Sequence, residues 1–149
     1  MTDEIRTPIG FWLKHLDQLI EDGFDAALAT ADLSRRQWQV LSVLRARPRE
    51  TPELIIELQP FLTLPDAERL LADLERRGWI SDRSGRHELT ADGVVAWSAA
   101  AEHAHEFRSL TASGVSDEDY RTTLRVLRTM AGNLSAAAAT SGAGEAPRN

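Results

Sequence analysis

The stretch "LERRGWISDRSGRHELTADG", residues 74–93, decides the fold because its apolar pattern changes period within twenty positions. It opens with the charged end of a helical segment, and Gly78 is typical of a residue that stops a helix. The runs "WISD" and "RHEL" then flank Arg83–Ser84–Gly85, and a glycine in a tight turn between two extended runs indicates a small β-hairpin. Thr90 follows as the predicted N-cap of the next helix.

Apolar residues on both sides of this stretch recur at steps of three and four, which indicates amphipathic helices. Ser34 and Gln37 fit a capping box at the start of one helix, and Thr51–Pro52–Glu53 opens another. The predicted helices cover residues 8–28, 34–44, 51–58, 63–77, 90–107 and 116–134. Beyond Ser135 the chain is rich in Ala, Gly, Ser, Pro and Thr, so we expect residues 135–149 to form a disordered tail.

The composition narrows the class of protein. The chain has 149 residues, 42% of them hydrophobic, which suits one domain with a core of its own. The absence of cysteine excludes disulfides, a thiolate nucleophile and a cysteine-bound zinc site. No apolar run approaches the roughly 18 residues of a membrane-spanning helix, and the N-terminus is polar, so we expect a cytoplasmic protein with no membrane partner.

The net charge of −6 argues against non-specific nucleic-acid binding by the whole surface, yet the positive charge is concentrated in the middle of the chain. Two arginine groups lie there: Arg35, Arg36, Arg45, Arg47 and Arg49, then Arg69, Arg76, Arg77, Arg83 and Arg86. An arginine-rich genome is the alternative explanation, because Lys14 is the only lysine. Guanidinium groups gathered on one surface can pair with phosphate oxygens and position a duplex.

The order of two helices, a tight stop and a short hairpin is typical of a winged helix-turn-helix module. In such a module the second helix enters the DNA major groove and the hairpin reaches the flanking backbone. The predicted fold class is therefore mainly α with a small β-hairpin wing. It combines a winged helix-turn-helix with a helical lobe made of the first and last helices.

Four segments in this order resemble the MarR family of bacterial transcription regulators, over roughly residues 8–134. They are "ADLSRRQWQVL", "LLADLERRGWI", "ELTADG" and "GVSDEDYRTTLRVLRTMAGNL". The resemblance implies a homodimer in which the first and last helices of both chains form one helical lobe. Two winged helices would then face successive major grooves about 34 Å apart, so a pseudo-palindromic operator in double-stranded DNA is expected.

The apolar pattern supports a dimer separately from the resemblance. The first and last helices offer more apolar surface than a winged-helix core of ~70 residues could cover, and uncovered stripes of that size usually meet a partner. We therefore divide the chain into functional segments. They are a dimerisation helix over residues 1–33, the winged helix-turn-helix over 34–92, C-terminal dimerisation helices over 93–134 and the tail over 135–149.

Three arginines are the first candidates for DNA contact. The resemblance places Arg69 where the family has an arginine that reaches bases or backbone, and Arg83 and Arg86 where the wing carries one. For Arg69 the alternative is an exposed ion pair with Asp66, Asp73 or Glu68.

Four further residues are weaker candidates for DNA contact. Thr63 would bind phosphate or cap its helix, and Asp66 would accept a hydrogen bond from a cytosine or repel phosphates. Arg76 and Arg77 would contact DNA or act as solvated charges at a helix end. The acidic turn over residues 63–69 and the short wing both depart from the family pattern.

A small aromatic molecule is the candidate effector, because control by a ligand is the second function that the resemblance implies. Trp12, His15, Trp38 and Trp97 lie on the helices that would wall the cleft, and core packing is the alternative for each. No catalytic motif occurs, so we expect no enzyme and no cofactor. We expect no metal site either, because His103 and His105 point about 200° apart on a helix.

Two functions follow as hypotheses. The first is a homodimeric, ligand-responsive MarR-type regulator that acts as a repressor or activator at a pseudo-palindromic operator. The second is a dimeric winged-helix module that binds a ligand or a protein and has lost specific DNA binding, which the acidic turn and the short wing permit.

Overall fold

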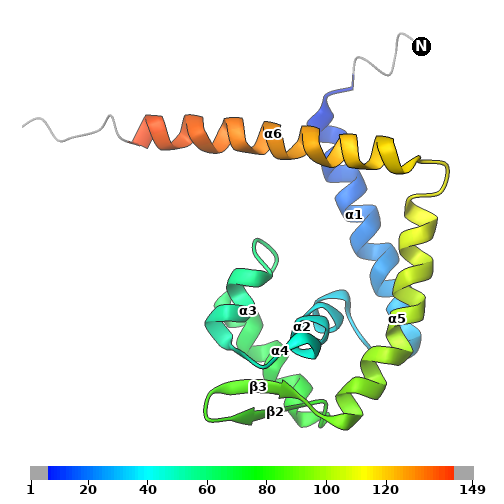
Figure 1. Cartoon of the computed structure of the whole chain (residues 1–149), viewed down its shortest axis with the longest axis vertical. Coiled ribbons are helices and arrows are strands. Elements are labelled where there is room, and N and C mark those ends of the chain that lie inside the picture. Colours follow the sequence, from blue (N-terminus) through cyan, green and yellow to red (C-terminus); the bar gives the residue numbers. More distant parts are fainter. Residues whose placement is uncertain (1–6, 143–149) are drawn as a thin grey trace, which may run out of the picture. The chain divides into compact units, whose positions relative to one another are not determined.

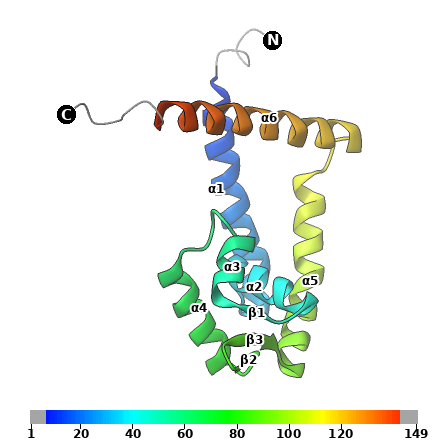
Figure 2. The same cartoon turned by 60° about the vertical axis from the view of Figure 1, so that its left-hand side comes forward.

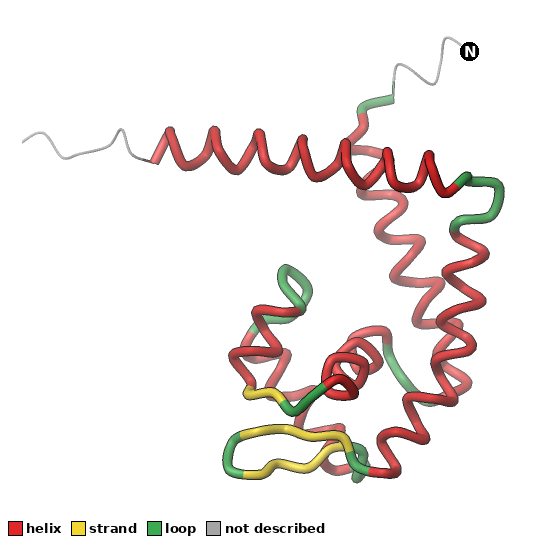
Figure 3. The backbone as a smooth tube through the Cα atoms, viewed as in Figure 1, coloured by secondary structure: helices red, strands yellow, loops and turns green. Residues whose placement is uncertain are grey.

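The computed structural model of the chain describes residues 7–142, and within that range it contains six α-helices, a 3-10 helix and three short strands (Figures 1 and 3). Two compact units make up the chain, one ending at Thr111 and one beginning at Ala112. The elements of the first unit are α1 (Ile9–Leu28), η1 (Ala29–Ala31), α2 (Arg35–Ala46), β1 (Arg49–Glu50), α3 (Thr51–Glu57), α4 (Leu64–Arg76), β2 (Ile80–Arg83), β3 (Arg86–Leu89) and α5 (Ala91–Thr111). The second unit contains α6 (Asp117–Gly142).

Side-chain caps confirm the predicted starts of α2, α4 and α5. Ser34 accepts a hydrogen bond from the Gln37 backbone, and the Gln37 side chain accepts one from the Ser34 backbone, so both halves of the capping box are present. Thr63 caps α4 through the backbone N–H of Asp66. Thr90 accepts from the Gly93 N–H at 3.0 Å at the start of α5. Each cap satisfies backbone donors that the first helical turn leaves without a partner.

The hairpin forms with β2 and β3 antiparallel, and Arg83 pairs with Arg86 across the turn. Ser84 and Gly85 have φ angles of 55° and 83°, as a two-residue turn between twisted strands requires. The hairpin is the larger part of a three-stranded sheet of order β1-β3-β2, because β1 pairs with the outer side of β3. The sequence predicted two strands, and the structure adds β1 as a third. The sequence did not indicate β1 because a strand of two residues is too short to show alternation.

The core of the first unit lies where α2, α4 and α5 meet the C-terminal half of α1. Figure 2 shows α2, α3, α4 and the strands clustered beside that half of α1. The most completely buried large side chains are Leu28, Val40, Leu41, Leu54 and Leu74. Phe24 of α1 packs edge-on against Phe107 of α5, with ring centroids 4.9 Å apart.

Two glycines permit the tight connection between α4, the wing and α5. Gly78 follows α4 with a φ of +74°, a left-handed conformation that residues with a side chain rarely adopt. Gly93, in the first turn of α5, lies so close to Trp79 that a Cβ atom would come within 1.9 Å of the Trp79 carbonyl oxygen. The hairpin is thereby held close to both helices.

The helix α6 extends beyond the predicted end near Leu134. It begins after Ser116, whose hydroxyl accepts from the Asp119 N–H, as expected, and it continues to Gly142. The prediction of disorder is therefore corrected for residues 135–142, because the alanines at 136–139 have the highest helix propensity of any residue. The rest of the predicted tail, 143–149, lies outside the described residues.

Candidate nucleic-acid interface

The outward face of α4 carries the first group of candidate residues. Ala67, Leu71 and Leu74 are buried, so the opposite face presents Arg69, Ala72 and Arg76 to solvent. Arg69 and Arg76 are two helical turns apart, which is about 10.5 Å along the axis. Their side chains are 77% and 76% exposed. The small Ala72 between them leaves room for a groove edge to approach the helix.

The first turn of α4 is a closed set of polar contacts. Thr63 Oγ1 donates to Asp66 Oδ2, and Asp66 Oδ1 accepts from Arg69. The Thr63 hydroxyl, followed by the Arg69 guanidinium, lowers the pKa of the Asp66 carboxyl below its ordinary value. Both alternatives raised for these residues are thus formed: Thr63 caps the helix, and Arg69 makes an exposed ion pair. Such a pair contributes at most about 1 kcal/mol, so Arg69 can exchange it for a phosphate contact.

The two wing arginines lie in different surroundings. Arg83, next to the turn, is 80% exposed, and its Nε lies 2.6 Å from Glu88 Oε1. Arg86 is half-exposed, donates to the Pro48 carbonyl oxygen at 3.2 Å and pairs with Glu50 at 3.4 Å. Arg83 therefore presents most of its side chain to solvent while it pairs with Glu88, whereas Arg86 braces β3 against the chain before α3.

Arg76 and Arg77 also differ in exposure and in their partners. Arg76 is exposed and pairs with Asp73. Arg77 donates to the Asp32 carbonyl oxygen at 2.6 Å, pairs with Asp73 at 2.9 Å and lies over the Trp79 ring. Arg77 thus ties the end of α4 to the loop after η1, and its side chain is only 25% exposed.

The charge of α4 is negative even though its outward face carries arginines. Its thirteen residues include four acids, Asp66, Glu68, Asp73 and Glu75, against Arg69 and Arg76, for a balance of −2. Asp73 is turned inward, where Arg76, Arg77 and the Gln37 side chain all bind it. The acidic side chains therefore lie beside Arg69 and Arg76 and leave most of both arginine side chains exposed.

The four residues predicted to contact an effector form two separate pairs. Trp38 is buried and stacks on Trp97, with ring centroids 6.5 Å apart and Arg108 over the Trp38 ring. Trp12 and His15 lie together on the exposed N-terminal half of α1, with ring centroids 6.3 Å apart. Trp38 and Trp97 belong to the core cluster, which favours core packing for this pair.

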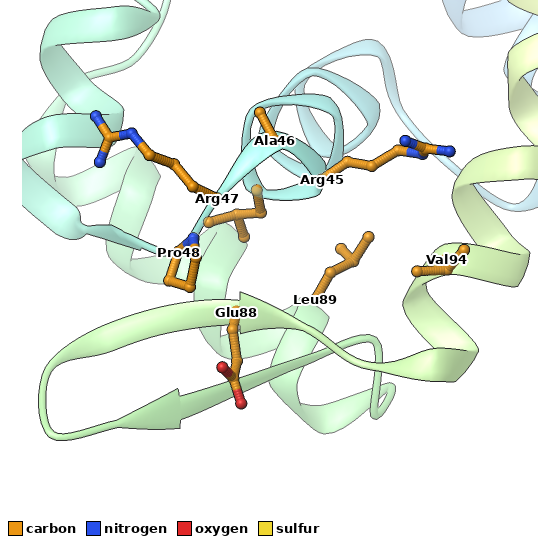
Figure 4. A pocket seen from close by; sticks show the side chains of 8 residues that line it. Arg45, Ala46, Arg47, Pro48, Glu88, Leu89 and Val94 are labelled. Carbon is orange, nitrogen blue, oxygen red and sulfur yellow. The ribbon is translucent and has the colours of Figure 1, made fainter.

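A cavity of about 310 Å³, open to solvent, lies between the end of α2, β3 and the start of α5 (Figure 4). None of the four predicted effector residues lines it. Its lining residues are Leu44, Arg45, Ala46, Arg47, Pro48, Glu88, Leu89 and Val94.

Sequence reasoning missed the internal role of Arg49. Its side chain is only 8% exposed, pairs with Glu57 of α3 and donates to the Arg47 carbonyl oxygen at 2.9 Å. From the sequence alone, Arg49 is only a member of the central group of arginines. Only the pairing of β1 with β3 reveals that it faces inward, and no sequence signal marks that pairing.

Large apolar side chains are exposed on α1 in the first unit and, separately, on α6 in the second unit. The N-terminal half of α1 exposes six large apolar side chains: Ile9, Phe11, Trp12, Leu13, Leu16 and Leu19. On α6, Tyr120, Val126, Met130 and Leu134 are exposed, and no residue of that helix is buried. No helix within residues 7–142 has the length and apolar composition needed to cross a membrane.

The chain is similar to several solved structures over most of its length. One is a mutant of MarR from E. coli complexed with operator DNA, with a TM-score of 0.73, 20% identity and coverage of 87% of this chain and 97% of that chain. Another is a MarR-family protein of Mycobacterium tuberculosis in complex with DNA, with a TM-score of 0.68, 21% identity and coverage of 83% and 98%.

A third is the transcriptional repressor CouR bound to p-coumaroyl-CoA, with a TM-score of 0.73, 23% identity and coverage of 83% and 91%. No protein-family model and no curated protein matches the sequence. Likeness at this level of identity establishes the fold, and the predicted winged-helix class is confirmed.

Proposed function

We propose that this chain, whose fold is that of the MarR-type regulators, is a homodimeric transcriptional regulator that binds a pseudo-palindromic site in double-stranded DNA. The observation that carries the proposal is the joint exposure of Arg69, Arg76 and Arg83 on α4 and the wing, the elements that a winged helix presents to DNA. MarR-type structures with the same fold have been solved with DNA bound.

The arginines would have different roles in DNA binding. Arg69 and Arg76 would enter or flank the major groove with α4, and Arg83 would contact backbone or minor groove from the wing. Arg86 would act by bracing the wing. Thr63 and Asp66 would set the start of α4, and Arg77 would fix its end.

The exposed apolar half of α1 supports a dimer. Six large apolar side chains in about three turns exceed what a monomer usually leaves in water, and α6 offers a second uncovered stripe. A two-fold interface made of these helices would bury both stripes and place two α4 helices about 34 Å apart. The segments 1–33 and 93–134 stay the predicted dimerisation segments.

Response to a small aromatic effector is the finer part of the proposal. CouR, of the same fold, was solved with an aromatic CoA ester. The exposed pair Trp12 and His15 is the better candidate for such a contact, because the other pair belongs to the core. A non-enzymatic role follows from the same proposal, and a cytoplasmic location stays a prediction.

The triple substitution Arg69→Ala, Arg83→Ala and Arg86→Ala tests the proposal. Wild-type protein should bind its operator with a log–log salt slope of about −5 to −9, as expected if about six to ten phosphates are neutralised per dimer. The triple variant should bind at least about tenfold more weakly and with a shallower slope. A matched control, Arg121→Ala, Arg125→Ala and Arg128→Ala on α6, removes the same charge and should leave both values unchanged if the dimer is intact.

The alternative is a dimeric module that binds a ligand or protein and does not read DNA. The net negative charge of α4 favours it, because carboxylates near phosphates repel them. Equal DNA occupancy by the wild type and the triple variant, with both dimeric, would support this alternative.

A further inference from the structure

Three side chains from three elements meet at the root of the wing. Asp82 of β2 and His87 of β3 are direct cross-strand partners, so both side chains lie on the same face of the hairpin. Glu75, in the last turn of α4, reaches the same place. One potential ligand atom from each residue lies within 4.8 Å of the other two.

His87 is held as a metal-binding imidazole is held. The residue is only 7% exposed, and its Nε2 lies 3.0 Å from the Thr51 hydroxyl. Its Nδ1 is buried and makes no hydrogen bond, although it lies 3.4 Å from Glu75 Oε1. If Nε2 carries the proton and donates it to Thr51, Nδ1 keeps a free lone pair aimed at the two carboxylates. In metal sites, a hydrogen bond from the other ring nitrogen of this kind usually fixes the tautomer of the bound histidine.

Neither carboxylate of the cluster is neutralised by an arginine. Within residues 7–142, Asp82 accepts only from the Gly85 N–H, and Glu75 has no ion-pair partner except His87. Arg49 lies beside His87 in the sheet, but its charge is directed to Glu57. Two carboxylates and one imidazole therefore share one small site, and a divalent cation would balance the carboxylate charge.

We propose that Glu75, Asp82 and His87 bind one divalent transition-metal ion, with Zn²⁺ as the best fit, and so fasten the wing to the end of α4. One imidazole nitrogen and two carboxylate oxygens suit Zn²⁺, with water as the fourth ligand. In a tetrahedral zinc site neighbouring ligand atoms lie about 3.3 Å apart, and Nδ1 and Glu75 Oε1 are already at 3.4 Å. Asp82 is exposed, and its ligand oxygen lies within 4.8 Å of the ligand atoms of the other two residues.

The site does not include the two histidines that the sequence analysis weighed as metal ligands. His103 and His105 are close in sequence but do not share a face of α5, and His103 Nδ1 lies 4.0 Å from Glu106. The three proposed ligands are separated in sequence and meet only because α4 turns sharply at Gly78 into the hairpin. The expectation of no metal site was based on His103 and His105 and did not consider His87.

One consequence rests on the proposed function. A bound cation would cancel the charge of two carboxylates between α4 and the wing, both of which would face DNA. It would also fix the angle between these two elements. Zn²⁺ should therefore raise the DNA affinity of the wild type but not that of Glu75→Gln.

Isothermal titration of the full-length chain with ZnCl₂, without an affinity tag and after treatment with a chelator, tests the metal site in the absence of DNA. We expect one Zn²⁺ per chain, no comparable binding of Mg²⁺, and weaker binding as the pH falls, because the ligands must be deprotonated. On addition of Zn²⁺ the ¹⁵N signal of His87 Nδ1 should shift while Nε2 keeps its proton.

Variants separate this site from adventitious binding. Glu75→Gln and Asp82→Asn, both at exposed positions, should each weaken Zn²⁺ binding by at least about tenfold, and Thr51→Val by about 10- to 100-fold. The control His15→Gln, His103→Gln and His105→Gln removes three exposed or half-exposed imidazoles outside the cluster and should leave the affinity unchanged. The metal site is overturned if the wild type binds no Zn²⁺, or binds it no more tightly than Glu75→Gln does.

The measurement of DNA affinity has outcomes that are independent of the Zn²⁺ titration. Operator binding by the metal-free wild type tests the proposed regulator, whatever the titration gives. If Zn²⁺ binds at the cluster without changing DNA affinity, the site stands and its coupling to DNA is overturned.

Discussion

The two halves of α1 carry the same apolar pattern but lie in different environments. In the C-terminal half Phe24 is 5% exposed and Leu28 is fully buried, packed against α2 and α5. In the N-terminal half Trp12 and Leu16 are 53% and 49% exposed. One continuous stripe is thus covered by the chain's own core at one end and left uncovered at the other.

An amphipathic pattern therefore predicts that one face of a helix is buried, but it does not show whether the chain's own core or a partner covers that face. The same contrast divides the arginines. Arg49 is nearly buried and pairs within the chain, whereas Arg83 has 80% of its side chain exposed. Under the proposed function, the exposed apolar half of α1 meets a second copy and the exposed arginines meet DNA.

The largest expected effect is on the dimer. Leu16→Glu should raise the dimer dissociation constant at least about 100-fold, because a two-fold interface loses the buried leucine twice. Sedimentation velocity should find monomers at concentrations where the wild type is dimeric, with helix content by circular dichroism retained. Gln18→Glu, on the polar side of the same half, is the control and should stay dimeric. A dimeric Leu16→Glu protein would contradict the proposed interface.

A substitution in the buried half of α1 should lower the free energy of unfolding at every protein concentration. Leu28→Ala should lower the free energy of unfolding by about 2–5 kcal/mol, because it leaves a cavity in a fully packed core. Urea denaturation at several protein concentrations measures this change. A loss below about 1 kcal/mol would mean that this half of the helix is not packed as described.

Arg49 offers the same comparison among charged residues. Glu57→Gln removes the partner of a nearly buried guanidinium and should cost about 1–3 kcal/mol of unfolding free energy. Glu68→Gln, at an exposed position with no ion pair within residues 7–142, should change it by less than about 0.5 kcal/mol. Equal effects of the two substitutions in urea denaturation would remove the distinction between inner and outer charges.

The cap of α4 should contribute less. Thr63→Ala removes the side chain that accepts from the Asp66 N–H and should cost about 1 kcal/mol, whereas Thr63→Ser keeps the hydroxyl and most of the stability. Thermal unfolding of both variants checks this order. The reverse order would show that the methyl group of Thr63, and not its oxygen, stabilises the helix start.

The smallest effect concerns pH. The folded pKa of Asp66 is lowered by Thr63 and Arg69, so its contribution to stability is present above the ordinary carboxyl pKa and is lost as the pH falls through the lowered value. The urea midpoint of Asp66→Asn should therefore fall less than that of the wild type between neutral pH and about pH 3. Parallel pH profiles of the two proteins would contradict this assignment.

Much of the fold could be predicted because the signals are local. The capping box of Ser34 and Gln37, the cap at Thr63 and the stop at Gly78 each depend on residues within a few positions of one another. The hairpin followed from Gly85 between two short extended runs. The sequence misjudged the end of α6 because a run of alanines between polar residues is low in complexity and yet favours a helix.

The candidate site was harder to predict because its contacts join residues far apart in the chain. Arg77 binds Asp32 forty-five positions away, and Arg86 pairs with Glu50 thirty-six positions away. The inward direction of Arg49 depends on β1, a strand of two residues. Which arginines remain exposed is therefore decided by tertiary pairing, and residue type alone does not reveal it.

Genome-wide footprinting of the purified protein on genomic DNA of its source organism tests the central claim most directly. A dimeric regulator should protect a small set of sites that share a two-fold symmetric motif, with half-sites about one helical turn apart. Uniform protection of any duplex, or no protection at low salt by a protein shown to be dimeric, would contradict it.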